Sequence, residues 1–179
     1  IWSNIISLNQ LGGDMLFQIK GICQNCAEDA NILVHNGLPK SRCSSCDEDP
    51  FEIETITGVV YIINNDNQKG LKIGQTSKTV EQRCKQLAST GVPGTFHPIA
   101  IFPSTNPKKH EKRAHDKLLN KNLAKEHFDL EPVEAVLSLY RTFNKKIMPI
   151  FYDENIKERF FLELELAKIE MKIKLKGKK

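Results

Sequence analysis

The sequence predicts an α+β protein, in which a cysteine-rich segment precedes a domain of short strands and helices and a C-terminal tail. Two Cys-x2-Cys pairs lie within residues 23–46. A β-branched and aromatic run at residues 58–63 starts a strand hairpin, and three helical patterns follow between residues 80 and 143. The length of 179 residues suits one ordinary domain or two small ones.

The composition excludes several classes of protein. Hydrophobic residues make up 40% and charged residues 27%, which is ordinary for a globular chain and not for a disordered one. No apolar run reaches the roughly 18 residues of a membrane helix, so we expect a soluble protein that does not enter membranes. Five cysteines are an odd number, which argues against a disulfide framework. The chain starts at Ile1, so we expect a trimmed or partial chain.

Charge divides the chain into three parts. Residues 1–50 hold three basic and six acidic residues, residues 51–150 hold fifteen and ten, and residues 151–179 hold eight and six. The change falls near Asp49-Pro50, where a proline also favours a turn. We therefore predict an N-terminal arm and metal-binding domain over residues 1–50, a basic domain over 55–145 and a tail over 146–179.

The four cysteines of the first part have the spacing of a structural zinc site. Cys23-x2-Cys26 is followed after sixteen residues by Cys43-x2-Cys46. Two residues between the cysteines let both thiolates face one ion, and two such pairs complete a tetrahedral shell with no open position. Two disulfides or free thiols are the alternatives, and His35 is more simply a bystander. The segment resembles a zinc ribbon, and residues 1–20 before it form an arm or the end of an upstream element.

The middle part reads as alternating strands and helices. Residues 58–63 and 71–74 form a hairpin around a polar turn, and residues 99–102 form a third strand. Helices are predicted at residues 80–89, with Thr79 as the N-cap, and at 108–121 and 132–143. Cys84 falls on the apolar face of the first helix, so we expect it in the core rather than as a nucleophile.

The order of motifs in this part resembles the GIY-YIG endonuclease superfamily, and more closely a phage and bacterial branch that writes its second motif as Lys-Ile-Gly. The matching segments are Gly58-x2-Tyr61, Lys72-Ile73-Gly74-Gln75-Thr76, Arg83, Thr90-Gly91-Val92-Pro93, Glu111-x3-His115 and His127-Phe128-Asp129-Leu130. The resemblance covers about residues 57–143. It implies a small three-stranded antiparallel sheet flanked by helices, and hydrolysis of DNA phosphodiester bonds with one divalent metal ion held by a single Glu.

The resemblance also assigns roles. It makes Glu111 the ligand of a catalytic Mg²⁺ or Mn²⁺, and a carboxylate oxygen suits such a hard ion. It makes Tyr61 the group that orients or deprotonates the attacking water, and Arg83 can hold phosphate oxygens with its guanidinium. Lys72 stands where other members carry a second Tyr, so the identity of the general base stays open. As a catalytic candidate, Lys72 either lowers the pKa of Tyr61 or contacts the phosphate. The further candidates are His115, which assists the site or orients Glu111, and Gly74, which permits close approach of the backbone.

Basic residues gather over residues 108–125. This segment contains seven Lys and Arg residues and only two acidic residues, Glu111 and Asp116. Such an excess of positive charge fits either a solvated helix face or steering of a phosphate backbone. As substrate-binding candidates we name Lys108, Lys109 and Lys112, together with Gly74.

The tail can be read in two ways. Apolar residues alternate with charged ones from Phe160 to Leu175, which favours a strand, but the Glu, Lys, Leu and Ala content favours a helix. As a helix it carries two opposed apolar stripes, and so would need two packing surfaces, the body and a partner chain or second copy. We expect a helix used in association.

Three functions follow from the sequence. The leading one is a metal-dependent DNA endonuclease with structural zinc, in the cytoplasm of a bacterial or phage-infected cell. The second is a catalytically silent module that binds nucleic acid or protein on the same fold. The third is an assembly subunit held together by its tail.

Overall fold

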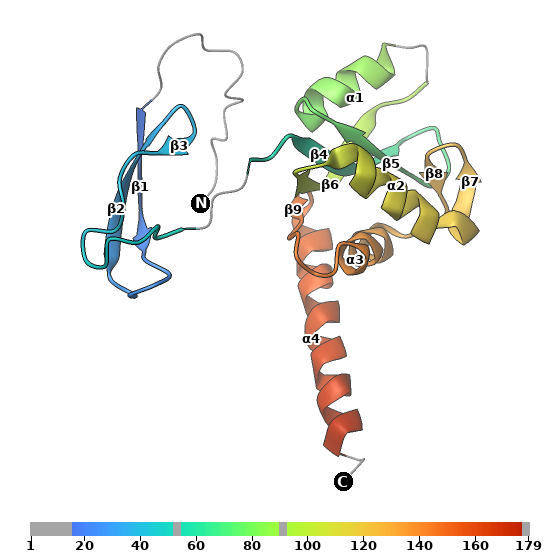
Figure 1. The fold of residues 1–179 in the computed structure, drawn as a ribbon. Coiled ribbons are helices and arrows are strands. Elements are labelled where there is room, and N and C mark those ends of the chain that lie inside the picture. Colours follow the sequence, from blue (N-terminus) through green and yellow to red (C-terminus); the bar gives the residue numbers. More distant parts are fainter. Residues whose placement is uncertain (1–15, 52–54, 90–92, 177–179) are drawn as a thin grey trace. The chain divides into compact units, whose positions relative to one another are not determined.

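The computed structural model describes residues 16–51, 55–89 and 93–176, which form two compact units, Ile1–Glu54 and Thr55–Lys179 (Figure 1). Most of the predicted arm, residues 1–15, lies outside the described residues, as do Thr90, Gly91 and Val92. No helix in the described ranges has both the length and the apolar character needed to cross a membrane.

Unit 1 contains a three-stranded antiparallel sheet in the order β1-β2-β3. Side chains alternate along β2, where Ala30, Ile32 and Val34 are buried and their neighbours face out. Residues 16–20 of the predicted arm belong to β1, so this part of the arm is an integral strand. The strands are Leu16–Ile22 (β1), Asp29–His35 (β2) and Leu38–Pro39 (β3).

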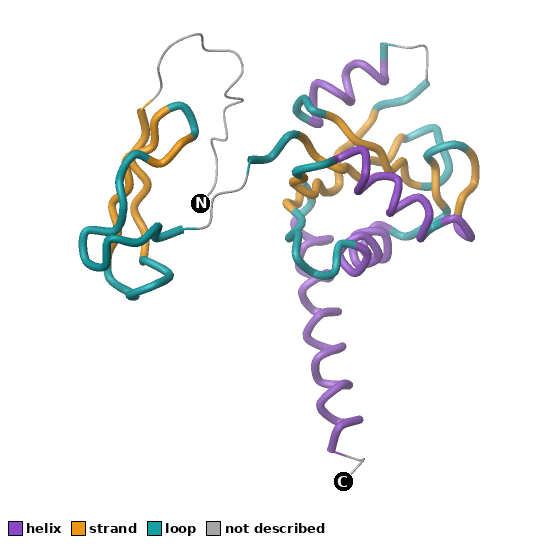
Figure 2. The backbone as a smooth tube through the Cα atoms, viewed as in Figure 1, coloured by secondary structure: helices purple, strands orange, loops and turns teal. Residues whose placement is uncertain are grey.

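Unit 2 confirms the α+β class. Its sheet has the order β7-β8-β5-β4-β6-β9, and every pairing is antiparallel. Figure 2 shows the strands in orange among the purple helices. The three predicted strands form its centre, and short strands extend it on both sides. The central strands are Gly58–Asn65 (β4), Leu71–Thr76 (β5) and Phe96–Ser104 (β6), and the edge strands are Asn122–Ala124 (β7), His127–Phe128 (β8) and Ile150–Phe151 (β9).

The predicted helices of unit 2 are present, with well-defined starts. Thr79 caps the first helix as expected, because its hydroxyl accepts a hydrogen bond from the Gln82 backbone N–H. Asn106 caps the second in the same way through Lys109, and the predicted helix 108–121 divides into an α-helix and a 3₁₀ turn. The helices are Val80–Ala88 (α1), Pro107–Lys117 (α2), Leu119–Lys121 (η1), Pro132–Thr142 (α3) and Glu154–Lys176 (α4).

Helices cover both faces of this sheet. Apolar side chains of β4 point alternately to one face and to the other, so both faces need to be covered. Val60 and Ile62 point into a large core that α2, α3 and the start of α4 complete. Tyr61 and Ile63 point the other way, into a smaller cluster completed by α1. Cys84 lies in this smaller cluster, as predicted for a core thiol. The central strand therefore sends Tyr61 toward α1.

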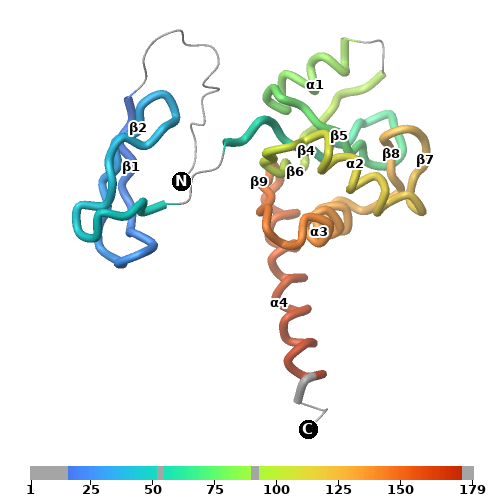
Figure 3. The backbone as a smooth tube through the Cα atoms, in the orientation of Figure 1, coloured from blue at the N-terminus to red at the C-terminus, as the bar shows by residue number. Residues whose placement is uncertain are grey.

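The tail is helical. Phe160 is fully buried in the core of unit 2, where its ring packs edge-on against Tyr140 of α3 at 5.4 Å between centroids. Ile156 and Leu164, one turn to either side, pack against the same core. This packing against unit 2 decides between a helix and a strand for the tail. The buried residues repeat with the helical period of 3.6, whereas the alternation of apolar and charged residues does not correspond to a strand. The helix then continues past α3 and β9 (Figure 3).

Candidate functional site

Tyr61 and Gly74 form the tightest point of the central hairpin. They are direct cross-strand partners on β4 and β5, and the Tyr61 ring lies over the Gly74 backbone. A Cβ atom at position 74 would lie 2.6 Å from Cζ of Tyr61, so only glycine leaves room for the ring. The close approach expected for Gly74 is therefore made by a side chain of the protein itself, and it fixes where the Tyr61 hydroxyl lies.

Arg83 reaches this hydroxyl from α1. Its Nε donates a hydrogen bond to the Tyr61 oxygen at 3.4 Å. Burial raises the pKa of Tyr61, and the neighbouring Arg83 offsets only part of that rise. The phenol therefore stays protonated near neutral pH, and it can orient a water molecule or a phosphate oxygen as a neutral hydroxyl.

Glu111 lies on α2 beside the same group. Burial raises the pKa of its carboxyl, and the negative charge of Glu126 raises it further. His115, a backbone hydrogen bond at Gln75, and Lys72 act in the opposite direction. Glu111 and Glu126 also act electrostatically on both Tyr61 and Arg83, so these four side chains share one neighbourhood. Half-buried carboxylate oxygens are suitable ligands for a hard divalent ion.

Glu126 is a member of this group that the sequence analysis missed. It lies in the turn before β8, and its backbone carbonyl accepts a hydrogen bond from Ile73 of β5. Its carboxylate pairs with the ammonium group of Lys72, which is buried in the sheet. Lys72 therefore neutralises a carboxylate at this site. The signal that could have found Glu126 is its position directly before the His127-Phe128 motif.

Two histidines fix the position of α2 and hence of Glu111. His110 Nδ1 and the Ser104 hydroxyl of β6 share a hydrogen bond at 2.7 Å, and burial lowers the pKa of His110, which favours the neutral ring. His115 Nε2 donates to the Ile73 carbonyl of β5 at 2.9 Å. Because Glu111 lies between them on the helix, this contact of His115 fits the orienting role predicted as one of its two alternatives.

A cavity of about 500 Å³ opens beside Arg83. Lys78 and Lys108 also line it, with Gln75, Asn106 and several hydroxyl-bearing residues, and none of the described residues that line it is acidic. Lys108, a predicted substrate-binding residue, therefore lies on the wall of this cavity. Lys112, about one turn further along α2, pairs instead with Asp116 at 3.1 Å. Lys109 is exposed in the first turn of α2.

A comparison with protein families finds one domain that this region resembles. Residues 58–144 match the T5orf172 domain. This is a nuclease-like domain family, and the match takes in the whole group around Tyr61, although it covers slightly less than half of the chain. None of the curated proteins and none of the solved structures that were compared matches the chain.

The T5orf172 domain match makes an endonuclease-related activity and DNA as a partner the natural interpretation of residues 58–144. The region has the components that such chemistry needs. A carboxylate on α2 can hold a metal ion and acts electrostatically on a guanidinium and a hydroxyl that are hydrogen-bonded to each other. The guanidinium and two lysines line the adjoining cavity. The predicted site residues Tyr61, Arg83 and Glu111 thus come together from three different elements.

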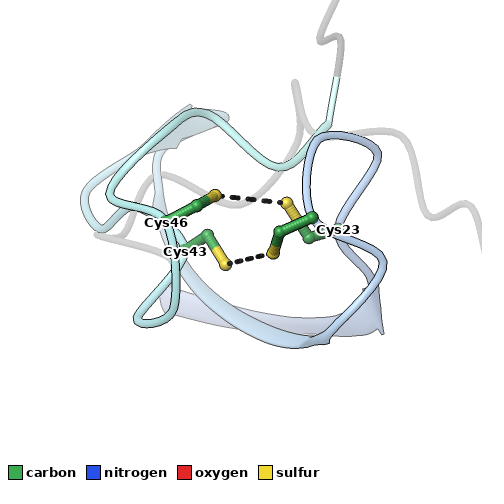
Figure 4. A group of neighbouring side chains, drawn as sticks. Cys23, Cys43 and Cys46 are labelled. Atoms are coloured by element: carbon green, nitrogen blue, oxygen red, sulfur yellow. Dashed lines mark hydrogen bonds between the residues drawn. The ribbon is translucent and has the colours of Figure 1, made fainter.

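The second site is the cysteine cluster of unit 1. The four Sγ atoms of Cys23, Cys26, Cys43 and Cys46 lie within 4.8 Å of one another (Figure 4). The Cys23–Cys46 and Cys26–Cys43 sulfur distances are 3.8 and 3.7 Å, far longer than a disulfide. They equal the edge of about 3.8 Å that a tetrahedron with Zn–S bonds of about 2.3 Å has. The four side chains can therefore bind a metal ion such as zinc.

Both halves of this cluster use one backbone design. The Cys23 N–H donates to the Glu28 carbonyl and the Cys43 N–H to the Glu48 carbonyl, at 2.8 and 3.0 Å. The residue after each second cysteine, Ala27 or Asp47, has a positive φ near 60°. Backbone N–H groups of Ser45 and Cys46 lower the pKa of Cys43 to about 6, whereas burial and the neighbouring thiols raise the pKa of Cys46 to about 12, so Cys43 is the thiol that ionises first. Among the described residues His35 is not part of the cluster.

Proposed function

We propose that residues 58–144 form a metal-dependent DNA endonuclease of the GIY-YIG type, acting in the cytoplasm of a bacterial or phage-infected cell. The observation that carries the proposal is the hydrogen bond between Tyr61 and Arg83 at the edge of a cavity lined by cations, with Glu111 near enough to act electrostatically on both side chains. The matching T5orf172 domain supports a nuclease-like function for the same residues.

Glu111 would hold the catalytic Mg²⁺ or Mn²⁺, which supplies charge neutralisation at the phosphate and a site for the leaving oxygen. The donor chemistry fits, because the carboxyl is half-buried and lies near a second carboxylate. His110 and His115 hold α2 against β6 and β5, so the carboxylate is positioned before substrate arrives.

Arg83 binds the scissile phosphate in this proposal. One of its nitrogens, Nε, is engaged by the Tyr61 hydroxyl, which leaves the two terminal nitrogens of the guanidinium for phosphate oxygens. Tyr61 orients the attacking water as a neutral hydroxyl, because burial keeps its pKa above the usual value. Lys78 and Lys108 guide a neighbouring phosphate along the cavity.

The cysteine cluster of unit 1 is proposed to hold a structural zinc ion. Four thiolates fill a tetrahedral shell, so this ion has no open position for a substrate. A scaffold or docking role then falls to unit 1, since its residues up to 50 carry a net negative charge that does not favour phosphate contacts.

One observation favours a second function, a binding module that does not cleave. Lys72 stands where the resemblance places a second Tyr, and its ammonium group is occupied by Glu126. A module of this kind would shift duplex DNA in a gel and leave it uncut with every divalent metal tested.

Relaxation of supercoiled plasmid distinguishes the two. We expect the full chain to nick plasmid with Mg²⁺ or Mn²⁺ and to stop with EDTA. Arg83→Gln should nick about a hundredfold more slowly, because the phosphate loses a guanidinium clamp. Arg141→Gln, an exposed arginine of α3, is the matched control and should nick as the parent does. Equal rates for the two variants would refute the site.

A further inference from the structure

The outer face of α4 carries an apolar stripe that no described residue of unit 2 covers. Leu162, Leu166, Ile169 and Ile173 follow one another at intervals of four, three and four residues. Their exposed fractions lie between 45% and 64%. The opposite face of the helix, with Phe160 and its neighbours, is the one that packs on the body. The exposed stripe is therefore a second, separate surface.

The spacing of this stripe is that of a coiled-coil seam. Alternating intervals of four and three residues place Leu166 and Ile173 at a positions and Leu162 and Ile169 at d positions. From residue 168 to residue 174 every side chain of α4 is exposed. Helical turns without tertiary contacts are only marginally stable in water, so a partner on this seam would supply the missing packing.

The distribution of charge along α4 favours a second copy of the same helix, in antiparallel orientation, as the partner. Residues 158–165 carry three Glu and one Arg, and residues 168–174 carry three Lys and one Glu. A second copy of the helix laid antiparallel brings the acidic half of each chain against the basic half of the other. In a parallel pair, acidic would face acidic and basic would face basic. We propose that two copies of this chain associate through α4 in an antiparallel coiled coil.

The seam fixes which residues meet. Leu162 packs against the partner's Ile173, and Leu166 against the partner's Ile169. Glu165 and Lys172 both flank the seam at g positions, which face each other in antiparallel pairs. Glu165 then lies opposite the partner's Lys172, twice in the symmetric dimer, while the e positions bring Glu163 opposite the partner's Glu170. In a parallel pair, Glu165 would instead face an e position of the partner, where it would meet Glu170. The antiparallel pair thus combines attractive and repulsive flanking pairs, whereas the flanking pairs of two Glu in a parallel pair are all repulsive.

Charge reversal at Glu165 tests both the dimer and its direction. In sedimentation equilibrium over micromolar to submillimolar concentrations, the parent chain should populate a dimer. Glu165→Lys should weaken it about tenfold or more, because two attractive pairs become repulsive. The double variant Glu165→Lys/Lys172→Glu should restore the parent affinity, since both pairs re-form with exchanged signs.

The controls separate this from damage to the helix. Lys168→Gln breaks the pair that Lys168 makes with Glu165 in its own helix at 2.6 Å, and it lies away from the seam. It should leave the dimer unchanged. Leu166→Glu/Ile169→Glu should give a monomer with the parent helix content, because both residues are exposed in the single chain. A parent chain that stays monomeric, or a tighter dimer in Glu165→Lys, would overturn the proposal.

Discussion

The cysteine cluster of unit 1 and the Tyr61 group of unit 2 are built in opposite ways. The cluster uses two copies of one local design, in which each Cys-x2-Cys turn closes with the same backbone hydrogen bond. The Tyr61 group draws single side chains from β4, α1 and α2, and no two of its three main members lie within twenty residues. The first site depends on local turns, and the second depends on the whole fold of unit 2.

The two units also differ in what holds them together. The core of unit 2 joins buried side chains from its central strands, α2, α3 and α4. Among the described residues of unit 1, 16–51, the buried core consists of Ala30, Ile32 and Val34 beside the buried cysteines, with Phe51 packed against them. So small a core rarely supports a fold alone, and a bound metal ion is the usual supplement. Unit 1 should therefore depend on its metal, and unit 2 should not.

Metal removal gives the largest expected effect. Stripping zinc with a chelator, or Cys43→Ser, should unfold unit 1, because structural zinc contributes on the order of 10 kcal/mol to folding. Amide NMR signals of residues 16–51 should collapse while those of unit 2 stay in place. Cys84→Ser, a change at a core thiol of unit 2, should leave one zinc per chain. A unit 1 that keeps its dispersed signals without metal would contradict this dependence.

Crowding at the centre of unit 2 gives a smaller effect. Gly74→Ala should destabilise unit 2 by about 1–3 kcal/mol in thermal unfolding, because the new methyl group overlaps the Tyr61 ring. It should also slow nicking by displacing the hydroxyl from Arg83. In a Tyr61→Ala background the ring is gone, so the same substitution should cost less than about 1 kcal/mol. Equal costs in the two backgrounds would show that the ring is not what excludes a side chain.

The smallest effect concerns the lysines of α2. Lys108→Gln should lower the slope of log binding constant against log salt by about 0.9 for duplex DNA, measured with EDTA present, because one phosphate contact is lost. Lys112→Gln should change the slope less, since Lys112 pairs with Asp116 rather than lining the cavity. A larger change of the slope in Lys112→Gln than in Lys108→Gln would indicate that the DNA does not pass along the cavity.

Local patterns explain what the sequence could predict. The central strands, the first three helices and the Thr79 cap follow from residue type and periodicity within short windows. The edge strands β7, β8 and β9 contain two or three residues each, too few for a periodic signal. The tail was ambiguous because its alternation fits a strand, and burial of Phe160 against α3 is a tertiary fact.

The candidate site shows the same limit. Tyr61, Arg83 and Glu111 were predicted through a resemblance in motif order, since nothing in their separate surroundings marks them. Glu126 was missed because its importance lies in its neighbours Lys72 and Glu111, which are distant in sequence. The cysteine cluster needed no such help, because its spacing encodes its geometry.

Glu111→Gln tests the central claim most directly, with plasmid nicking and thermal unfolding measured on the same sample. The pKa of Glu111 is raised in the folded chain, so its charge costs stability above the pKa of the unfolded chain. The neutral amide removes this cost, and unit 2 should unfold at a temperature no lower than the parent's. Nicking with Mn²⁺ should fall by about a hundredfold or more. A variant that cuts as fast as the parent would contradict the assignment of the catalytic site.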